Sequence, residues 1–410
     1  MPNRINLKSF LKFGYFIDYK NTKVFFDIEN IDRKKYIHYS EKELIDLGHS
    51  LFLEAVQRNF NTNTEQFVPL SGGLDSRFIL SALLEFTDAS SITTITYGSP
   101  GTFDFELGNK TAKKTGTNHL SIPLNNLKYD SDEILETARK FDLQTSLFFH
   151  PPLKILNNYV QNGDVWSGFM GDPGAGSKLK LPYSETLEQA SDFFISKNNF
   201  CSTSKRISIS PDEIIPFMDR SDTKSEISID EELDFYNRQL KYIAPHVLYK
   251  GANFKTPFTD NEYFNFILSL PDEYRQNQAL FKKILIQKYP EEFSVPVKNN
   301  FGRSLSASDS DIKISKLYYK LKSIILGGID PMTNYVDFSK ELKTNSSLKD
   351  IVFQSVNDLK TRKIIDEIVD IDVILDEYHK SKNDHSIFLL LLASLELNLK
   401  AGLTTKKGKI

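Results

Sequence analysis

One short run of residues has the composition of a phosphate-binding loop: Leu70, Ser71, Gly72, Gly73, Leu74, Asp75 and Ser76. Adjacent glycines allow a tight turn and a close approach of the backbone to a ligand. Hydroxyls, free amides and the positive end of a following helix dipole all favour an anion. Asp75 would repel phosphate unless Mg²⁺ lay between them. The run therefore predicts a nucleotide-phosphate loop with a metal ion at Asp75.

The elements around this loop alternate between short apolar runs and helical runs. We predict strands at 66–70, 92–97, 119–124 and 164–167, and helices at 41–59, 75–86, 105–115, 132–141 and 153–160. Alternation at this spacing indicates a parallel sheet with helices on both faces. Ligands of such sheets bind at the carboxyl ends of the strands. The predicted fold class is α/β, with a doubly wound parallel sheet and the loop at a strand end.

The chain is expected to divide into three parts. Residues 1–60 form a small N-terminal element, in which Lys23–Ile28 has the pattern of a strand. Residues 61–305 form the nucleotide-binding part, interrupted by a loop-rich insertion at about 178–229. Residues 306–410 are mostly helical and complete it. Further helices are predicted at 231–243 and 386–400.

The Leu70–Ser76 run resembles the PP-loop of ATP pyrophosphatases. With leucine at its centre, it is most similar to the loop of the synthetase domain of asparagine synthetase. In that family the loop holds pyrophosphate while ATP is cleaved between its α and β phosphates. The resemblance implies ATP and Mg²⁺ as cofactors and a sheet like that of the adenine nucleotide alpha hydrolases. Arg77 follows where the family often has serine, which fits a divergent branch.

Later residues match the same family in order, so that the resemblance covers roughly residues 60–305. It implies nucleotide contacts at Tyr97, Gly98, Ser167 and Gly168, a second magnesium carboxylate at Asp172, and catalytic lysines at Lys298 and Lys282. The physical requirement agrees, because a phosphate-bridging Mg²⁺ needs carboxylates from separate loops. The Lys255–Asp260 segment also resembles a family motif.

Two departures from the family bear on where the nitrogen comes from. Phe169 stands where relatives carry a glutamate that positions or deprotonates the incoming amine. The glutaminase nucleophile of full asparagine synthetases directly follows the initiator methionine, but Pro2 occupies that position and Cys201 is the sole cysteine. We therefore expect no working glutaminase and a separate source of amine or ammonia. The segments 14–16 and 24–28 are interpreted as a possible glutaminase remnant.

Composition narrows the choice of partners. The 51 basic residues do not exceed the 54 acidic ones, which disfavours a nucleic acid substrate. The longest aliphatic run, 387–393, is far shorter than the ~20 residues that span a bilayer. The seven histidines lack metal-site spacing, and an ordinary structural role is favoured for His150, which could line a cleft. We expect a cytoplasmic protein that does not bind a membrane.

The resemblance implies an ATP-dependent amide-forming synthetase that adenylates a small-molecule carboxylate, releases pyrophosphate and transfers the acyl group to an amine or ammonia. Three alternatives stay open. They are a lasso-type peptide macrolactam cyclase, a PP-loop enzyme that modifies tRNA, and a non-catalytic nucleotide-binding partner. Residues 178–250 and 305–380 are expected to determine the substrate.

Overall fold

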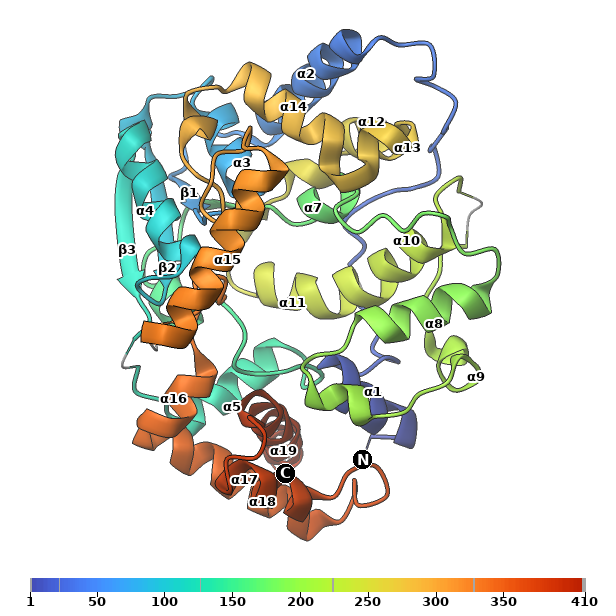
Figure 1. The fold of residues 1–410 in the computed structure, drawn as a ribbon, viewed down its shortest axis with the longest axis vertical. Helices are drawn as coiled ribbons and strands as arrows, with labels where there is room; N and C mark the ends of the chain where they lie inside the picture. Colours follow the sequence, from blue (N-terminus) through green and yellow to red (C-terminus); the bar gives the residue numbers. More distant parts are fainter. Residues whose placement is uncertain (1, 22, 126, 223–224, 327–328, 408–410) are drawn as a thin grey trace.

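Five parallel strands form the sheet of the protein in a computed structural model, which describes residues 2–21, 23–125, 127–222, 225–326 and 329–407 (Figure 1). The strands are β1 Gln66–Pro69, β2 Ile92–Gly98, β3 Asn118–Pro123, β4 Asp164–Trp166 and β5 Asn253–Lys255. They pair in the order β3-β2-β1-β4-β5. The predicted α/β fold with a parallel sheet is confirmed. The sequence analysis did not predict β5.

Both faces of the sheet are covered, as neighbouring residues of one strand show. Val68 of β1 and Trp166 of β4 belong to one buried cluster, whereas Phe67 and Val165 belong to another. Successive side chains of a strand point to opposite faces, so each face carries its own core. This is the doubly wound arrangement that the alternating pattern predicts.

The first core holds helices on either side of the phosphate loop in sequence and those of the 261–288 segment. They are α2 Glu41–Asn59, α3 Asp75–Leu83, α4 Phe103–Thr115, α12 Asn261–Ser269, α13 Asp272–Arg275 and α14 Ala279–Lys288. The short helix α7 Gly171–Gly174 contacts α12. Helix α2 begins with a capping box, in which Ser40 and Glu43 each bind the other's backbone amide. Its bounds agree with the predicted helix at 41–59.

The second core is formed mainly by the C-terminal helices, which gather at one end of the molecule (Figure 1). Its helices are α5 Ser131–Lys140, α6 Leu153–Asn157, α16 Phe338–Thr344, α17 Ser346–Arg362, α18 Ile371–His379 and α19 Ser386–Lys407. Helix α15 Asp309–Leu326 precedes α16 in the sequence and crosses the face shown in Figure 1. No helix of the described residues is long and apolar enough to cross a membrane.

The prediction of strands near the N-terminus is wrong. Residues 4–13 form helix α1 Arg4–Phe13, and 23–28 run without strand pairing. Two of the apolar residues that suggested a strand, Phe26 and Ile28, are buried, whereas Val24 is exposed. Phe26 packs against the rings of Phe235 and Phe264. An irregular segment can show a strand-like pattern when its alternate side chains enter a core and its backbone has no edge to pair with.

The segment predicted as a loop-rich insertion, 178–229, contains two α-helices, α8 Leu187–Lys197 and α9 Pro211–Ile214. They form a third buried cluster with α1 and with α10 Ile229–Asp234. The polar composition hid these helices, since only one face of each is apolar. Beyond α10 the predicted 231–243 helix continues as a π-helix, Phe235–Ile243, and then as α11 Ala244–Val247.

Candidate nucleotide-binding site

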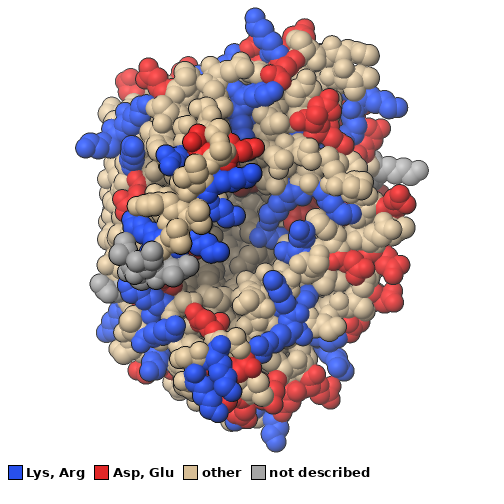
Figure 2. Space-filling view, viewed as in Figure 1, with Lys and Arg blue, Asp and Glu red and all other residues tan. Residues whose placement is uncertain are grey.

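A cavity of about 730 Å³ opens beside the carboxyl ends of β1 and β4. Strand order reverses between these two strands, since β2 and β3 lie on one side and β5 on the other. Such a switch point leaves a crevice between the loops that leave the two strands. Figure 2 shows this face of the molecule hollowed at its centre, with lysine and arginine side chains around the hollow. The volume falls in the range of small-molecule sites.

The predicted phosphate loop forms one wall of this cavity and is held by its own hydrogen bonds. The amide of Ser71 donates to Oγ of Ser76 at 3.2 Å, and the amide of Gly73 donates to Oγ of Ser71 at 3.2 Å. Helix α3 begins at Asp75, so its first-turn amides lie at the cavity. Leu70 and Leu74 also line the cavity, with backbones that continue the turn from strand to helix. A self-bonded loop of this kind presents a preformed cradle to an anion.

The two predicted metal carboxylates meet in this cavity. The amide of Asp172 donates to Oδ2 of Asp75 at 3.1 Å, and Oδ1 of Asp75 is buried with no hydrogen-bond partner among the described residues. Burial, followed by the charge of Asp172, raises the pKa of the Asp75 carboxyl well above its ordinary value. The pKa of the Asp172 carboxyl is also raised, chiefly because the surrounding cavity wall removes solvent from it. Part of the residue is still exposed to solvent. A buried carboxylate oxygen without a donor beside a second carboxylate suits a divalent cation.

Two glycines allow this close approach of the β4 loop to Asp75. A Cβ at Gly168 would lie 2.8 Å from Cβ of Asp75, and a Cβ at Gly171 would lie 2.6 Å from its carboxyl carbon. Both contacts are shorter than Cβ atoms normally make, so a side chain at either position would have to displace the Asp75 side chain. Between them, Met170 has a positive φ of 67°, a conformation that costs free energy for a bulky residue.

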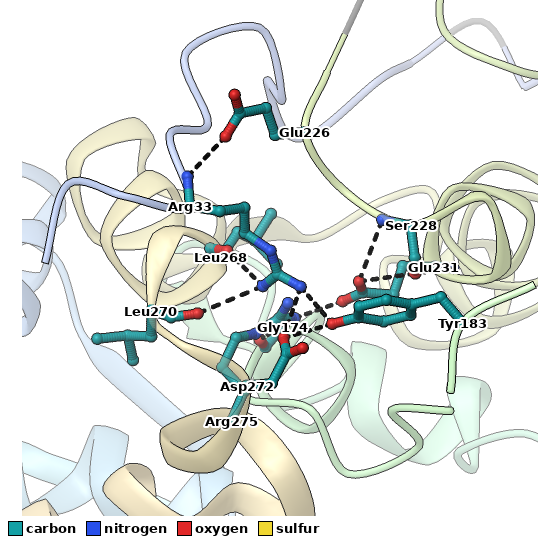
Figure 3. Close-up of polar contacts among 10 residues, drawn as sticks. All are labelled: Arg33, Gly174, Tyr183, Glu226, Ser228, Glu231, Leu268, Leu270, Asp272 and Arg275. Atoms are coloured by element: carbon teal, nitrogen blue, oxygen red, sulfur yellow. Dashed lines mark hydrogen bonds and ion pairs between the residues drawn. The ribbon is translucent and has the colours of Figure 1, made fainter. Parts of the chain in front are cut away.

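A buried network fixes helix α7, which carries Asp172 (Figure 3). Arg275 is fully buried, and its Nη2 donates to the carbonyl of Gly174 at 3.1 Å and to Oε1 of Glu231 at 2.5 Å. Glu231 in turn caps the start of α10 together with Ser228. Arg275 therefore ties the helix bearing Asp172 to the helix that leads into the π-helix.

A second arginine, Arg33 of the N-terminal segment, makes hydrogen bonds beside this network. Arg33 Nη1 donates to the carbonyls of Leu268 and Leu270, and its Nη2 binds Asp272 at 2.8 Å and the hydroxyl of Tyr183. Arg33 thus joins the N-terminal segment, the insertion and the start of α13, three segments far apart in the sequence (Figure 3).

Lys298 lies at the opposite edge of the phosphate loop. Its amide donates to the carbonyl of Gly72 at 2.9 Å, while its ammonium pairs with Asp104 Oδ2 at 2.5 Å and also binds Asn334. Asp104 lies in the first turn of α4, whose N-cap is Thr102. Asp104 does not cap this helix, and its carboxylate is available to orient Lys298.

Arg77 directly follows the phosphate loop, at the position where the resembled family often has serine. It is completely buried and donates to the carbonyls of Val295 at 2.8 Å and Pro296 at 3.1 Å. These carbonyls directly precede the segment that carries Lys298. The side chain that follows the phosphate loop thereby anchors the lysine segment to helix α3.

The remaining predicted residues fall in and beside the cavity. Tyr97 lines it and stacks on Tyr335, with ring centroids 5.8 Å apart. Gly72 and Gly98 do not line it: a Cβ at Gly72 would meet the Phe103 carbonyl at 2.6 Å, so this glycine serves packing against α4. Lys282 also lies outside the lining. Burial lowers its pKa, and the nearby Asp172 charge acts in the opposite direction.

Phe169 places an aromatic ring at the position where the family resemblance led us to look for a glutamate. Its ring lines the cavity and packs edge-to-face on Phe25 at 5.6 Å. Among the described residues, the acids at the cavity wall are Asp75, Asp104 and Asp172, and no histidine lines it. His150 does not line the cavity, and its ring nitrogens lie 2.6 and 3.0 Å from the carbonyls of Pro151 and Leu147.

Several cavity residues escaped prediction from the sequence. They are Asp104 and Asn334 beside Lys298, Tyr335 beside Tyr97, and Lys178, Arg238 and Gln239 on the far wall. Lys178 and Arg238 fall inside the 178–250 segment that was expected to determine the substrate. No local pattern distinguishes such side chains from solvated surface charges, because their placement depends on distant elements.

Comparison with known proteins agrees with this geometry. Residues 48–144, which include the phosphate loop, match the family model described as asparagine synthase. This part of the chain is similar to that family. A putative asparagine synthetase [glutamine-hydrolyzing] 2 from Methanocaldococcus jannaschii is 31% identical over 102 residues. This stretch is 21% of the present chain and 20% of that protein. The resemblance inferred from the sequence is thus confirmed, and the roles assigned to individual residues stay predictions.

Proposed function

We propose that this protein is an ATP-dependent synthetase that activates a carboxylate as its adenylate and forms an amide. The observation that carries the proposal is the meeting of Asp75, Asp172 and Lys298 around one phosphate-type loop at the switch point of the sheet. The asparagine synthetase-like segment supports the same chemistry. The cavity volume, within the small-molecule range, favours a small acid over a peptide.

In this proposal the substrate carboxylate attacks the α-phosphorus of ATP, and the bond to pyrophosphate breaks. Nitrogen then attacks the acyl carbon, AMP leaves with the bonding electron pair, and the nitrogen loses a proton. Ser71, Gly73 and Ser76 hold the departing pyrophosphate, and Tyr97 with Tyr335 forms an aromatic surface for the base. Lys298, oriented by Asp104, stabilises the charge that develops at the reacting centre. A preorganised donor of this kind typically contributes ~2.7–4 kcal/mol.

Asp75 and Asp172 would hold Mg²⁺, which neutralises phosphate charge when bound. The unpartnered Oδ1 of Asp75 fits this role, because a buried carboxylate oxygen without a donor is otherwise destabilising. Without the cation the paired carboxylates repel each other, which agrees with the raised pKa of Asp75. Nucleotide binding should therefore require the metal.

We infer that the nitrogen arrives as ammonia or as a neutral amine, supplied from outside this chain. Phe169 leaves the cavity without the family's glutamate, so deprotonation must occur elsewhere. Cys201 does not line the cavity, and its thiol lies 3.4 Å from the hydroxyl of Ser204. A separate ammonia-supplying protein is the partner that this arrangement calls for.

The test follows the fate of ATP. The protein is incubated with ATP, Mg²⁺, ammonia and a panel of small acids, and the nucleotide products are separated. We expect AMP and pyrophosphate in equal amounts, dependent on one class of acid. ADP with orthophosphate, or no binding of ATP in calorimetry, would rule out the proposal.

One observation favours a second candidate, a nucleotide-binding partner without catalysis. The same replacement by Phe169 removes a group that relatives use in the amide-forming step, while the ATP-side residues remain together. This candidate predicts magnesium-dependent ATP binding without AMP formation under any nitrogen donor.

A further inference from the structure

The outer face of helix α15 is apolar. Ile314, Leu317, Tyr318 and Leu321 follow one another at i, i+3, i+4 and i+7, the spacing that places side chains on one face of a helix. These residues, which we call the α15 stripe, are 61, 58, 56 and 47% exposed. Every other helix of the described residues carries at most one exposed large hydrophobic residue. The stripe is therefore a local concentration of exposed apolar surface.

The inner face of α15 holds the helix against the rest of the protein without the stripe. The hydroxyl of Ser315, a buried residue, donates to the carbonyl of Phe301 at 2.8 Å. The ring of Tyr319 packs edge-to-face on Phe103, with centroids 5.0 Å apart. A surface helix ordinarily turns its apolar stripe toward the core and its polar residues outward. The stripe of α15 faces solvent instead, which is typical of a surface that another macromolecule covers.

Helix α15 joins two segments that line the cavity. Lys298 precedes the helix and Tyr335 follows it, and both are lining residues. Through Tyr319 the helix also contacts Phe103, the neighbour of the lining residue Asp104. It crosses the face of the molecule that is hollowed (Figures 1 and 2). A macromolecule bound to the α15 stripe would therefore lie beside the cavity.

Lysines border the stripe on both sides. Lys313, Lys316, Lys320 and Lys322 belong to the same helix, and all four are exposed. Lys316 lies over the ring of Phe301, whereas Lys313 and Lys322 make no ion pair with any residue that the structure describes. The acids of the helix, at 309 and 311, are confined to its first turn. Positive charge beside an apolar stripe favours a partner with acidic residues beside its own apolar face.

The same charges disfavour a second copy of this chain as the occupant. In an antiparallel pair of α15 helices that buries both stripes, Ile314 of one copy lies opposite Leu321 of the other. This register also places Lys313 opposite Lys322. In a parallel pair each lysine lies beside its own counterpart. Like charges opposed across an interface are repulsive, so either pairing of two copies is opposed by charge.

Shape disfavours a lipid bilayer as the occupant. The face that α15 crosses is hollowed (Figure 2), so a flat bilayer could not follow it. Asp309 and Asp311 in the first turn would also be repelled by anionic headgroups. A helix of another protein can instead lie along α15 and contact the whole stripe.

We propose that the α15 stripe is the docking surface for a partner protein that presents an acidic amphipathic helix. The apolar face of that helix packs on the stripe, and its carboxylates pair with Lys313 and Lys322. The surface rests on α15 alone, so it does not depend on the proposed function.

The test uses a designed peptide as the probe. A hydrocarbon-stapled helical peptide carries leucines at i, i+3, i+4 and i+7 with glutamates beside them, and fluorescence anisotropy measures its binding to the full chain. One control peptide has lysines in place of the glutamates, and another has serines in place of the leucines. We expect the acidic peptide to bind at least about tenfold more tightly than either control.

One pair of variants locates the apolar contact. Leu317→Gln should weaken binding of the acidic peptide by about tenfold or more. Val373→Gln replaces an exposed valine of α18 and should leave the affinity unchanged. Thermal unfolding of each variant verifies that it is folded.

A second pair of variants tests the charges. Lys313→Glu combined with Lys322→Glu should reverse the preference, so that the peptide with lysines binds more tightly than the peptide with glutamates. Lys349→Glu combined with Lys382→Glu makes the same change of charge at exposed lysines outside α15. This control should keep the preference of the wild type.

Each outcome supports or overturns the docking surface. It is overturned if the acidic peptide does not bind, if Leu317→Gln binds it as tightly as wild type, or if the charge reversal leaves the preference unchanged. A dimer in light scattering that Leu317→Gln abolishes assigns the stripe to a second copy. Sedimentation with vesicles of phosphatidylcholine and phosphatidylglycerol that Leu317→Gln abolishes assigns it to a bilayer. If no AMP forms but the peptide preference holds, the proposed function fails while the docking surface stands.

Discussion

The two walls of the cavity are built on different physical principles. We define the strand-end wall as the loops Leu70–Ser76 and Ser167–Asp172, and the helical wall as Lys178 with the π-helix Phe235–Ile243. The strand-end wall approaches its ligand with backbone amides, hydroxyls and short carboxylates, and it packs so closely that Gly168 and Gly171 have no room for a side chain. The helical wall reaches the cavity with long, flexible side chains.

This difference between the two walls implies that they have different roles in binding. Under the proposed function, the triphosphate has the same phosphate groups whichever acid is used, and a backbone cradle suits such a ligand. Long side chains can be exchanged for a different acid without disturbing the fold. The strand-end wall should therefore determine nucleotide binding, and the helical wall should determine which acid is used.

The largest effect is expected from a substitution in the strand-end wall. Asp75→Asn should weaken magnesium-dependent ATP binding by about a thousandfold, because the metal's several kcal/mol of stabilisation are lost. The same change should stabilise the protein at neutral pH without ATP or Mg²⁺, since it removes a carboxylate whose pKa is raised by burial. Such a group lowers stability as pH rises above its unfolded-state pKa.

Calorimetry and urea unfolding check the two parts separately. Asp192→Asn, at an exposed aspartate outside the cavity, should change neither. A variant that keeps ATP affinity, or that loses stability at neutral pH, would contradict the metal role of Asp75.

The second prediction separates the rate of the chemical step from the affinity for ATP. Lys298→Ala should lower the rate of AMP formation by about 10²–10³, in line with the loss of one preorganised donor at a developing charge. ATP affinity should stay within about threefold, since Asp75, Asp172 and the loop amides remain. Quenched single-turnover reactions with the acid that supports pyrophosphate release measure the rate. Asp104→Asn should lower it less, because it only loosens the lysine. Near-wild-type AMP formation by Lys298→Ala would remove this lysine from the mechanism.

The phosphate loop of the strand-end wall was predictable because its conformation depends on residues that are neighbours in the sequence. Strand, glycine turn and helix follow one another within the Leu70–Ser76 run. The expectation that Asp172 joins Asp75 came from the family resemblance, and the pairing of β1 with β4 explains how the two residues come together.

The rest of the site depends on contacts that no local pattern contains. Asp104 had the sequence context of a helix cap, but it pairs with Lys298, 194 residues away. Arg238 lies in a region with a helical pattern, and the pattern gave no sign of the π-helix that turns it toward the cavity. At the N-terminus, Phe26 filled a core from an irregular segment, so its strand-like pattern was misleading.

A third prediction addresses how the helical wall is anchored. His246 on α11 is buried between the carbonyls of Tyr242 and Ser146, at 2.7 and 3.0 Å from its ring nitrogens. Burial lowers the pKa of this histidine from 6.5 to about 4. The unfolded chain therefore binds a proton more readily than the folded one between these values, so stability should fall as pH drops from 6.5 to 4. The full shift corresponds to about 3 kcal/mol.

His246→Gln removes this proton linkage and should flatten the stability profile in that interval. His150, which packs on the same Phe141 ring and also has a lowered pKa, contributes in the same direction and remains in the variant. Urea unfolding at pH 7.5, 6 and 5 gives the slope. An unchanged slope in the variant would show that His246 does not anchor the wall through its neutral form.

The smallest effect tests how tightly the strand-end wall is packed. In Gly171→Ala the new Cβ would lie 2.6–2.8 Å from the three carboxyl atoms of Asp75. The carboxylate is the end of a side chain and can rotate away, so the fold survives while the metal geometry is lost. We expect ATP affinity to fall by about tenfold, equivalent to 1.4 kcal/mol. The free energy of unfolding should change by about 1–2 kcal/mol at most.

Gly174→Ala provides the matched control within the same short helix. Its new Cβ would meet the ring of Phe264 at 3.1 Å and no atom of Asp75. Packing should suffer there, and ATP affinity should not. If both alanines lowered ATP affinity equally, α7 would act through its overall position and not through contact with Asp75. The strand-end wall would then depend on the Arg275 network as much as the helical wall does, and the contrast between the two walls would weaken.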